Sequence, residues 1–114
     1  MYVRKPWGHE LRWAVTEKYL GKILHIKPQH KLSRQYHEQK DETIYVLEGE
    51  LLLEIGKGDD IGVLHLEVGE TYRVKPYTVH RFCAGKKSCT LIEVSTPEID
   101  DVIRLEDEYD RVGE

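Results

Sequence analysis

The chain has 114 residues, a length that fits one domain spanning residues 1–114 and excludes a second independent core. Its 17 Lys and Arg against 21 Asp and Glu give a formal net charge of −4, so we expect no nucleic-acid partner. No apolar run approaches the ~20 residues of a membrane span, and the first ten residues lack the apolar stretch of a signal peptide. We therefore expect a cytoplasmic protein without membrane contact.

Short β-branched and aliphatic runs, separated by Gly, Pro and Asp, predict strands joined by turns. One turn is predicted at Glu48-Gly49, where glycine can adopt a positive φ. About eight short strands at regular spacing favour an all-β sandwich or barrel over an α/β fold. These predicted strands lie in residues 18–28, 43–55, 61–74 and 80–95.

The last part of the chain and the two cysteines leave alternatives open. Residues 97–111 are acidic with scattered apolar positions, which predicts a short C-terminal helix or an extended arm laid against the barrel. Cys83 and Cys89 flank a predicted turn, so a cross-strand disulfide is geometrically conceivable but requires an oxidising compartment. We expect free, partly buried thiols.

The polar stretch QYHEQKDE, residues 35–42, holds three side chains that could bind a metal ion. Gln35 and His37 lie two residues apart and project to the same side of a strand, and Glu42 can face them from an antiparallel neighbour. His80, at the start of a later strand, supplies a fourth donor, and four mixed N and O donors suit a divalent first-row metal. Taken singly, a histidine such as His37 is more often a surface residue than a metal ligand.

This spacing resembles the first motif of the cupins, small jelly-roll barrels of two β-sheets. That motif runs H-x-H, three or four residues, E, six residues, G, and residues 35 to 49 match it with Gln35 in the first histidine position. The second cupin motif runs G, five residues, P-x-G, two residues, H, three residues, N. Gly69 and His80 keep its spacing, whereas Lys75-Pro76-Tyr77 replaces P-x-G and Ala84 replaces Asn. The resemblance implies an all-β, single-domain cupin fold, a double-stranded β-helix.

Five pieces of the chain carry a closer resemblance: RKPWG, KLSRQYH, TVHRF, LIEV and DDVIRLEDEYDR. They are similar to R-x-P-W-G, L-S-x-Q-x-H, H-R-L, L-I-E-V and D-D-I-V-R-x-E-D-x-Y-x-R of the cupin domain of type II mannose-6-phosphate isomerases. That family binds zinc through Gln, His, Glu and His. The resemblance therefore implies a divalent metal, zinc ahead of Mn, Ni, Co or Fe, held by Gln35, His37, Glu42 and His80.

The implied isomerisation moves a proton between C1 and C2 of a sugar phosphate and needs a base. Glu42 is a poor base when it binds a cation, because the cation lowers its pKa. Glu93, which alternation places on one face with Leu91 and Ser95, is the better candidate, and an outward, solvated glutamate is the alternative. His30, close in sequence to the proposed ligands, is a second acid-base candidate.

A substrate phosphate needs cationic partners. The candidates are the basic residues near the proposed ligands in sequence, although alternation turns Arg81 away from His80. They are Arg34, Lys40, Lys75 and Arg81.

Three functions fit these observations. The first is a metal-dependent isomerase that interconverts mannose 6-phosphate and fructose 6-phosphate. The second is a non-catalytic metal-containing cupin that binds a sugar or another small polar ligand, because fold does not fix function. The third, an oxygen-dependent cleavage, requires a redox metal. Cupins commonly pair, so we also expect a homodimer, in which residues 1–8 could extend a partner's sheet.

Overall fold

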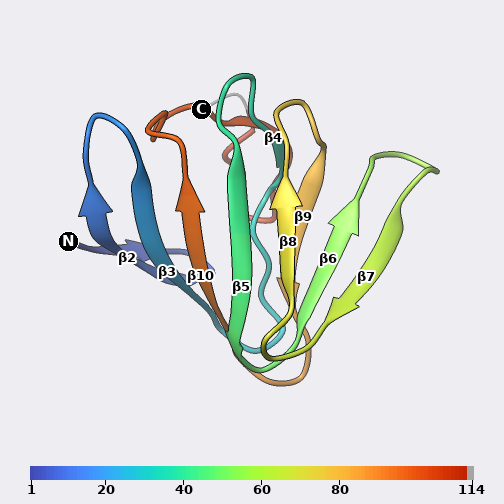
Figure 1. The fold of residues 1–114 in the computed structure, drawn as a ribbon. Helices are drawn as coiled ribbons and strands as arrows, with labels where there is room; N and C mark the ends of the chain where they lie inside the picture. The colour runs from blue at the N-terminus through green and yellow to red at the C-terminus, as the bar shows by residue number, and fades with distance from the viewer. Residues whose placement is uncertain (113–114) are drawn as a thin grey trace.

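The computed structural model describes residues 1–112, in which eleven β-strands form two antiparallel sheets that face each other (Figure 1). The described residues form no helix, and so none that could cross a membrane. The strands are β1 (Tyr2–Lys5), β2 (Gly8–Val15), β3 (Leu20–Ile26), β4 (Arg34–Tyr36), β5 (Glu42–Glu48), β6 (Leu51–Ile55), β7 (Gly62–Leu66), β8 (Thr71–Val74), β9 (His80–Ala84), β10 (Cys89–Ser95) and β11 (Ile103–Glu106).

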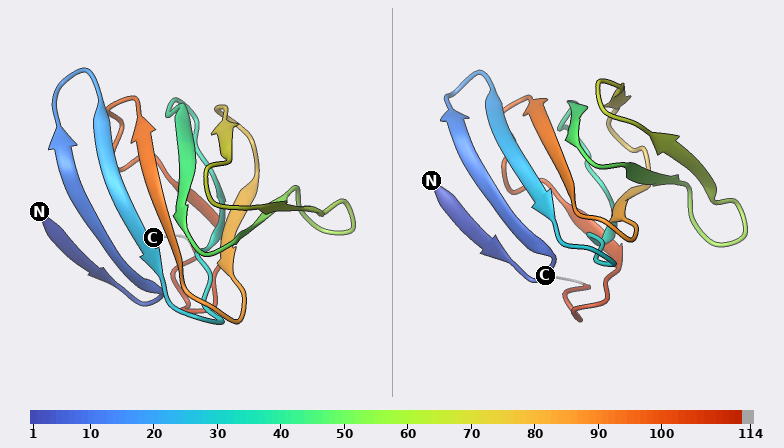
Figure 2. Two further views of the ribbon diagram at one scale, coloured as in Figure 1. Left: turned by 60° about the horizontal axis from the view of Figure 1, so that its bottom comes forward. Right: turned by 90° about the horizontal axis from the view of Figure 1, so that it is seen from below.

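The first sheet has six strands in the order β1-β2-β3-β10-β5-β8, and the second has five in the order β11-β4-β9-β6-β7. The chain crosses repeatedly between the sheets, which is the connectivity of a jelly-roll barrel. The turn between β6 and β7 projects away from the rest of the molecule (Figure 2). The expected all-β cupin fold is therefore confirmed.

The core follows from the two-residue period of the strands. In β5, Ile44 and Val46 point inward and are fully buried, whereas the intervening Tyr45 is 40% exposed. Burying each such side chain stabilises the fold by roughly 1.5–3 kcal/mol. The buried core consists of Trp7, Leu24, Ile26, Leu32, Ile44, Val46, Leu51, Leu53, Val74, Phe82, Ala84, Cys89 and Leu91.

The predicted strand segments are confirmed, but β1 and β2 were missed, although β2 with eight residues is the longest strand. Of the two structures proposed for residues 97–111, the structure has the extended arm: β11 pairs with β4 at the edge of the second sheet. At the other end, β1 pairs with β2 of the same chain and forms the edge of the first sheet. The homodimer stays a prediction.

Gly49 occupies the turn between β5 and β6 with φ +77°, and a Cβ atom there would lie 2.2 Å from the carbonyl oxygen of Ser88. We expect Gly49→Ala to lower the free energy of unfolding by roughly 2–4 kcal/mol, because the left-handed backbone alone costs an L-residue about 1–2 kcal/mol. Gly58→Ala is the control, since Gly58 has φ +60° and no heavy atom near the added methyl. Urea unfolding measures both losses, and equal losses would contradict the steric role of Ser88.

Cys83 and Cys89 are both free and buried, and their strands β9 and β10 belong to different sheets. Burial raises the pKa of each thiol to about 12, against 9.0 when unperturbed. Below pH 9 both states keep the thiol protons, so this contribution to stability is fully present there. Between pH 9 and 12 only the unfolded thiols ionise, and the free energy of unfolding falls.

We expect this loss to reach about 1.4 kcal/mol per pH unit per thiol. Urea unfolding under reducing conditions from pH 8 to 11 should show a shallower decline for Cys83→Ala/Cys89→Ala than for the wild-type protein. Parallel pH profiles would show that the buried thiols contribute nothing to the decline.

Candidate metal centre

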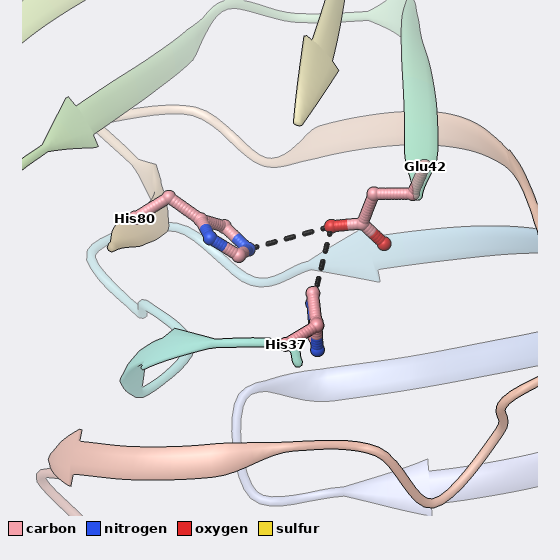
Figure 3. Close-up of side chains that lie close together, drawn as sticks. All are labelled: His37, Glu42 and His80. Carbon is pink, nitrogen blue, oxygen red and sulfur yellow. Dashed lines mark ion pairs between the residues drawn. The ribbon is translucent and has the colours of Figure 1, made fainter. Parts of the chain in front are cut away.

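Three buried side chains converge between the two sheets. His37 directly follows β4 and His80 begins β9, both in the second sheet, whereas Glu42 begins β5 in the first. One oxygen of Glu42, Oε1, faces both rings, 3.5 Å from His37 Nε2 and 3.3 Å from His80 Nε2 (Figure 3). One donor atom from each residue lies within 4.8 Å of the other two. Each of the three residues is at most 2% exposed.

Backbone carbonyl oxygens orient both histidine rings. His37 Nδ1 lies 2.5 Å from the carbonyl oxygen of Asp101, and His80 Nδ1 lies 2.8 Å from that of Thr78. A carbonyl oxygen only accepts hydrogen bonds, so each Nδ1 carries a hydrogen and each ring directs its Nε2 towards Glu42. Histidines that bind metals are commonly oriented in this way by their second nitrogen.

The three converging atoms, His37 Nε2, His80 Nε2 and Glu42 Oε1, are buried without a hydrogen-bond partner among the described residues. Leaving buried polar atoms unsatisfied costs free energy. A divalent cation would satisfy all three, and two imidazole nitrogens with one carboxylate oxygen are a donor set that first-row metals accept. The site is therefore compatible with a metal ion.

Gln35 lies beside this cluster. Its Cα faces that of His80 across the β4–β9 pair, and its side chain lines the same cavity as His37 and Glu42. Its Oε1 accepts a hydrogen bond of 2.7 Å from the hydroxyl of Ser33. The second lone pair of that amide oxygen is the one that a metal could use. Gln35 as the fourth ligand stays a prediction.

The loop before His80 keeps a left-handed residue although its sequence departs from P-x-G. Tyr77, in the glycine position, has φ +65°. Its N–H donates a 2.7 Å hydrogen bond to the carbonyl oxygen of His37. The altered turn is thus tied to the segment that carries the other histidine.

The cavity next to the cluster has a volume of about 340 Å³ and contains a chain of buried charges. Lys40 Nζ lies 3.1 Å from Glu42 Oε2 and 2.9 Å from Glu93 Oε2. Burial alone would lower the pKa of Lys40, but the carboxylates of Glu93 and Glu42 raise it, so Lys40 is charged. Burial raises the pKa of Glu93, and the charge of Glu42 raises it further.

Glu93 therefore points inward, as the alternation with Leu91 and Ser95 predicts, and the outward alternative is wrong: Glu93 is 3% exposed. Burial would also raise the pKa of Glu42. The two imidazoles and Lys40 hold it well below its usual range instead. Glu42 is thus an anionic donor and Glu93 a carboxylate of higher proton affinity in the same cavity.

Arg34 and Arg81, two of the four residues predicted to bind phosphate, are engaged elsewhere. Arg34 lies 2.5 Å from Glu54 Oε1 and 3.0 Å from Glu106 Oε1. Arg81 Nε donates a 2.8 Å hydrogen bond to the carbonyl oxygen of Leu32, and its Nη1 lies 3.8 Å from Glu106. Neither lines the cavity. Both arginines fasten β4 and β9 to neighbouring segments.

The structure also leaves Lys75 and His30 outside the cavity. Lys75 is exposed after β8. The carbonyl oxygen of His30 accepts a hydrogen bond from Ala84, at the opposite end of β9 from His80, and His30 Nδ1 contacts the carbonyl oxygen of Pro28. Of the four predicted phosphate ligands, only Lys40 reaches the cavity.

Charged residues of β1, β2 and β3 line the other side of the cavity and were missed by sequence reasoning. Lys22 could have been found, because the two-residue period of β3 places it on the inward face with Leu24 and Ile26. The remainder lie in strands without a clear apolar alternation. These residues are Lys5, Glu10, Arg12 and Lys22.

Comparison with known proteins agrees with this architecture. Residues 22–95 match the family model described as "Cupin domain", and the chain belongs to the cupin family. Xanthan biosynthesis protein XanB of Xanthomonas campestris pv. campestris (strain B100) is 30% identical over 118 residues, which cover 96% of this chain and 23% of XanB. The chain thus spans less than a third of that relative.

Two solved structures show the same fold. KdgF from Halomonas sp. has a TM-score of 0.76 at 18% identity and covers 88% of this chain and 90% of its own. An uncharacterized conserved protein with a double-stranded β-helix domain from Klebsiella pneumoniae has a TM-score of 0.75 at 25% identity and covers 93% and 87%.

Replacing a histidine of the cluster should remove metal binding. We expect His80→Ala to bind Zn²⁺ at least about 100-fold more weakly than the wild-type protein, since even residues that only orient a ligand cost 10–100-fold. His65→Ala, an exposed histidine on β7, is the matched control and should keep wild-type affinity. Titration against a competing chelator gives the affinities. Equal zinc affinity in the two variants would refute the site.

Proposed function

We propose that the protein is a metal-dependent sugar-phosphate isomerase that interconverts mannose 6-phosphate and fructose 6-phosphate. The observation that carries the proposal is the position of Glu93 in the same cavity as the donors His37 and Glu42. Its support in the sequence is the resemblance of five segments to type II mannose-6-phosphate isomerases. The relative XanB is named for xanthan biosynthesis, which is consistent with a role in sugar metabolism.

The proposed metal is Zn²⁺, held by His37, Glu42 and His80 with Gln35 as fourth ligand. A bound divalent cation would fix the hydroxyl groups of the sugar and stabilise negative charge that develops on oxygen. The donor set also accepts Mn, Fe, Co or Ni. Because it contains oxygen donors and is not an all-histidine set, it favours a metal that acts as a Lewis acid over a redox metal.

Glu93 is the proposed base. The reaction moves one hydrogen from C2 to C1 and another between the two oxygens, so it consumes no oxidant or reductant. Burial and the nearby Glu42 raise the pKa of Glu93, and a raised pKa brings a carboxylate closer to the value at which it both takes and returns a proton near neutral pH. Lys40 holds the Glu93 carboxylate in place.

The Lys40–Glu93 contact also favours the second candidate, a cupin that binds a sugar or another polar ligand without turnover. At 2.9 Å from Lys40, Glu93 is stabilised as an anion, which opposes proton transfer. The two candidates share the metal site and differ in whether Glu93 exchanges a proton with the ligand.

The variant Glu93→Gln separates proton transfer by Glu93 from metal binding. We expect the zinc-loaded variant to lose roughly 10²–10⁴-fold in kcat, the range of general acid-base catalysis, while its zinc content stays that of the wild-type protein. The measurement is a coupled assay for fructose 6-phosphate formed from mannose 6-phosphate. Glu48→Gln, an exposed glutamate at the end of β5, is the control.

Two results would count against the proposal. If zinc-loaded wild-type protein binds mannose 6-phosphate without forming fructose 6-phosphate, the non-catalytic candidate holds. If Glu93→Gln keeps wild-type kcat, another group is the base.

A further inference from the structure

Three cations of the first sheet surround a single carboxylate at the cavity. Arg12 Nε lies 2.7 Å, Lys22 Nζ 3.5 Å and Lys5 Nζ 4.0 Å from the oxygens of Glu10. All four residues line the cavity. We call Lys5, Arg12 and Lys22 the cationic wall.

The cationic wall carries a surplus of positive charge. One carboxylate cannot neutralise three cations, so two positive charges remain. Burial lowers the pKa of Lys5, and the neighbouring cations Arg12, Lys22 and Arg111 lower it further against the opposing effect of Glu10. The neighbouring cations therefore disfavour the positive charge of Lys5, and a bound anion would stabilise that charge.

Other acids of the cavity do not remove this surplus. Lys22 faces Glu93 across the β3–β10 pair, but Glu93 and Glu42 already share Lys40. Among the residues that line the cavity, six cations face five carboxylates, a surplus of one positive charge; the cations are Lys5, Arg12, Lys22, Lys40, Arg104 and Arg111, and the carboxylates are Glu10, Glu42, Glu93, Asp100 and Asp101. Asp101, which also lines the cavity, directs its carboxylate oxygens to the N–H groups of residues 38–40.

The cationic wall and Glu42 of the candidate metal centre lie at different positions across the first sheet. Arg12 and Lys22 are direct cross-strand partners in β2 and β3, and Glu42 begins β5, two strands beyond β3. Neighbouring strands are spaced by about 4.8 Å, and Glu42 lies two residues along β5 from Ile44, the residue aligned with Lys22 through Glu93, so the backbones at Lys22 and Glu42 are roughly 12 Å apart. A small molecule can therefore carry an anionic group at the wall while its other end faces the donors.

We propose that the cationic wall binds the phosphate of a phosphorylated small molecule, with the end of the ligand opposite the phosphate directed towards His37, Glu42 and His80. A phosphate monoester carries a charge between about −1.5 and −2 at pH 7, opposite in sign to the surplus of the wall. The arginine of the wall supplies several N–H donors in a planar fork suited to phosphate oxygens. The choice of mannose 6-phosphate as ligand rests on the proposed function, whereas the phosphate site rests on the cavity.

The test compares two double variants that each lose two positive charges. Lys5→Met/Arg12→Met removes them from the wall and keeps Lys22, the most buried of the three. Lys18→Met/Lys57→Met removes them from exposed turns outside the cavity. Circular dichroism and zinc content establish that each protein is folded and loaded.

Calorimetric titration of the zinc-loaded proteins with mannose 6-phosphate should show about 100-fold weaker binding for the wall variant, about tenfold per lost charged hydrogen-bond donor. The control variant should bind as the wild-type protein does. Mannose, which lacks the phosphate, should bind the wall variant and the wild-type protein with equal affinity. Wild-type affinity of the wall variant for mannose 6-phosphate would overturn the proposal.

Inorganic phosphate gives a second measurement that involves no sugar. It should raise the thermal midpoint of the wild-type and control proteins, and not that of the wall variant, because a ligand stabilises the state that binds it. If the double wall variant does not fold, the single variant Lys5→Met replaces it. We expect this variant to bind mannose 6-phosphate about tenfold more weakly. Unchanged affinity of Lys5→Met would also overturn the proposal. If the protein binds mannose 6-phosphate in a phosphate-dependent way but does not convert it, the proposed isomerase activity is refuted and the phosphate site at the cationic wall is still supported.

Discussion

The structure depends on one constraint: three polar atoms, from His37, Glu42 and His80, meet in a buried place without a hydrogen-bond partner among the described residues. Because Glu42 belongs to the first sheet and the histidines to the second, a cation bound there would join the two sheets. The C-terminal arm contacts the same cluster through Asp101. The Asp101 carbonyl orients His37, while its carboxylate caps the N–H groups of the loop that leads to Glu42. The arm is therefore a structural component of the metal site.

Strand direction explains why the polar residues collect at one end of the barrel. In β5 and β9 the inward residues begin with a polar group, Glu42 and His80, and continue with apolar ones. In β10 the order is reversed, with Leu91 before Glu93. Since β10 runs antiparallel to β5, the reversal brings Glu93 to the same end as Glu42. The opposite end can then be an apolar core that supplies the free energy to keep charged groups buried at the site.

The sequence predicts the cluster and not the cavity around it, for a physical reason. The spacing of His37, Glu42 and His80 within two motifs encodes the convergence of three strand ends, and the period of β10 is sufficient to turn Glu93 inward. Nearness in sequence misled the assignment of phosphate ligands. Neighbours of a ligand on a strand point to the opposite face, as Arg81 does beside His80. The cations of β1, β2 and β3 reach the cavity only through sheet pairings that join distant segments, and these leave no local pattern.

Lys40 connects the metal cluster to the rest of the cavity, since it touches Glu42 on one side and Glu93 on the other. Removing it would leave two buried carboxylates facing each other, an arrangement that costs several kcal/mol and that a protein relieves by protonating one of them. Burial and Glu42 raise the pKa of Glu93, and Lys40 opposes this effect. A ligand that displaces the Lys40–Glu93 contact would change the pKa of Glu93. A metal that draws Glu42 away from Lys40 would change it as well. The proposed isomerase and its non-catalytic alternative therefore differ in the role that they assign to the Lys40–Glu93 ion pair.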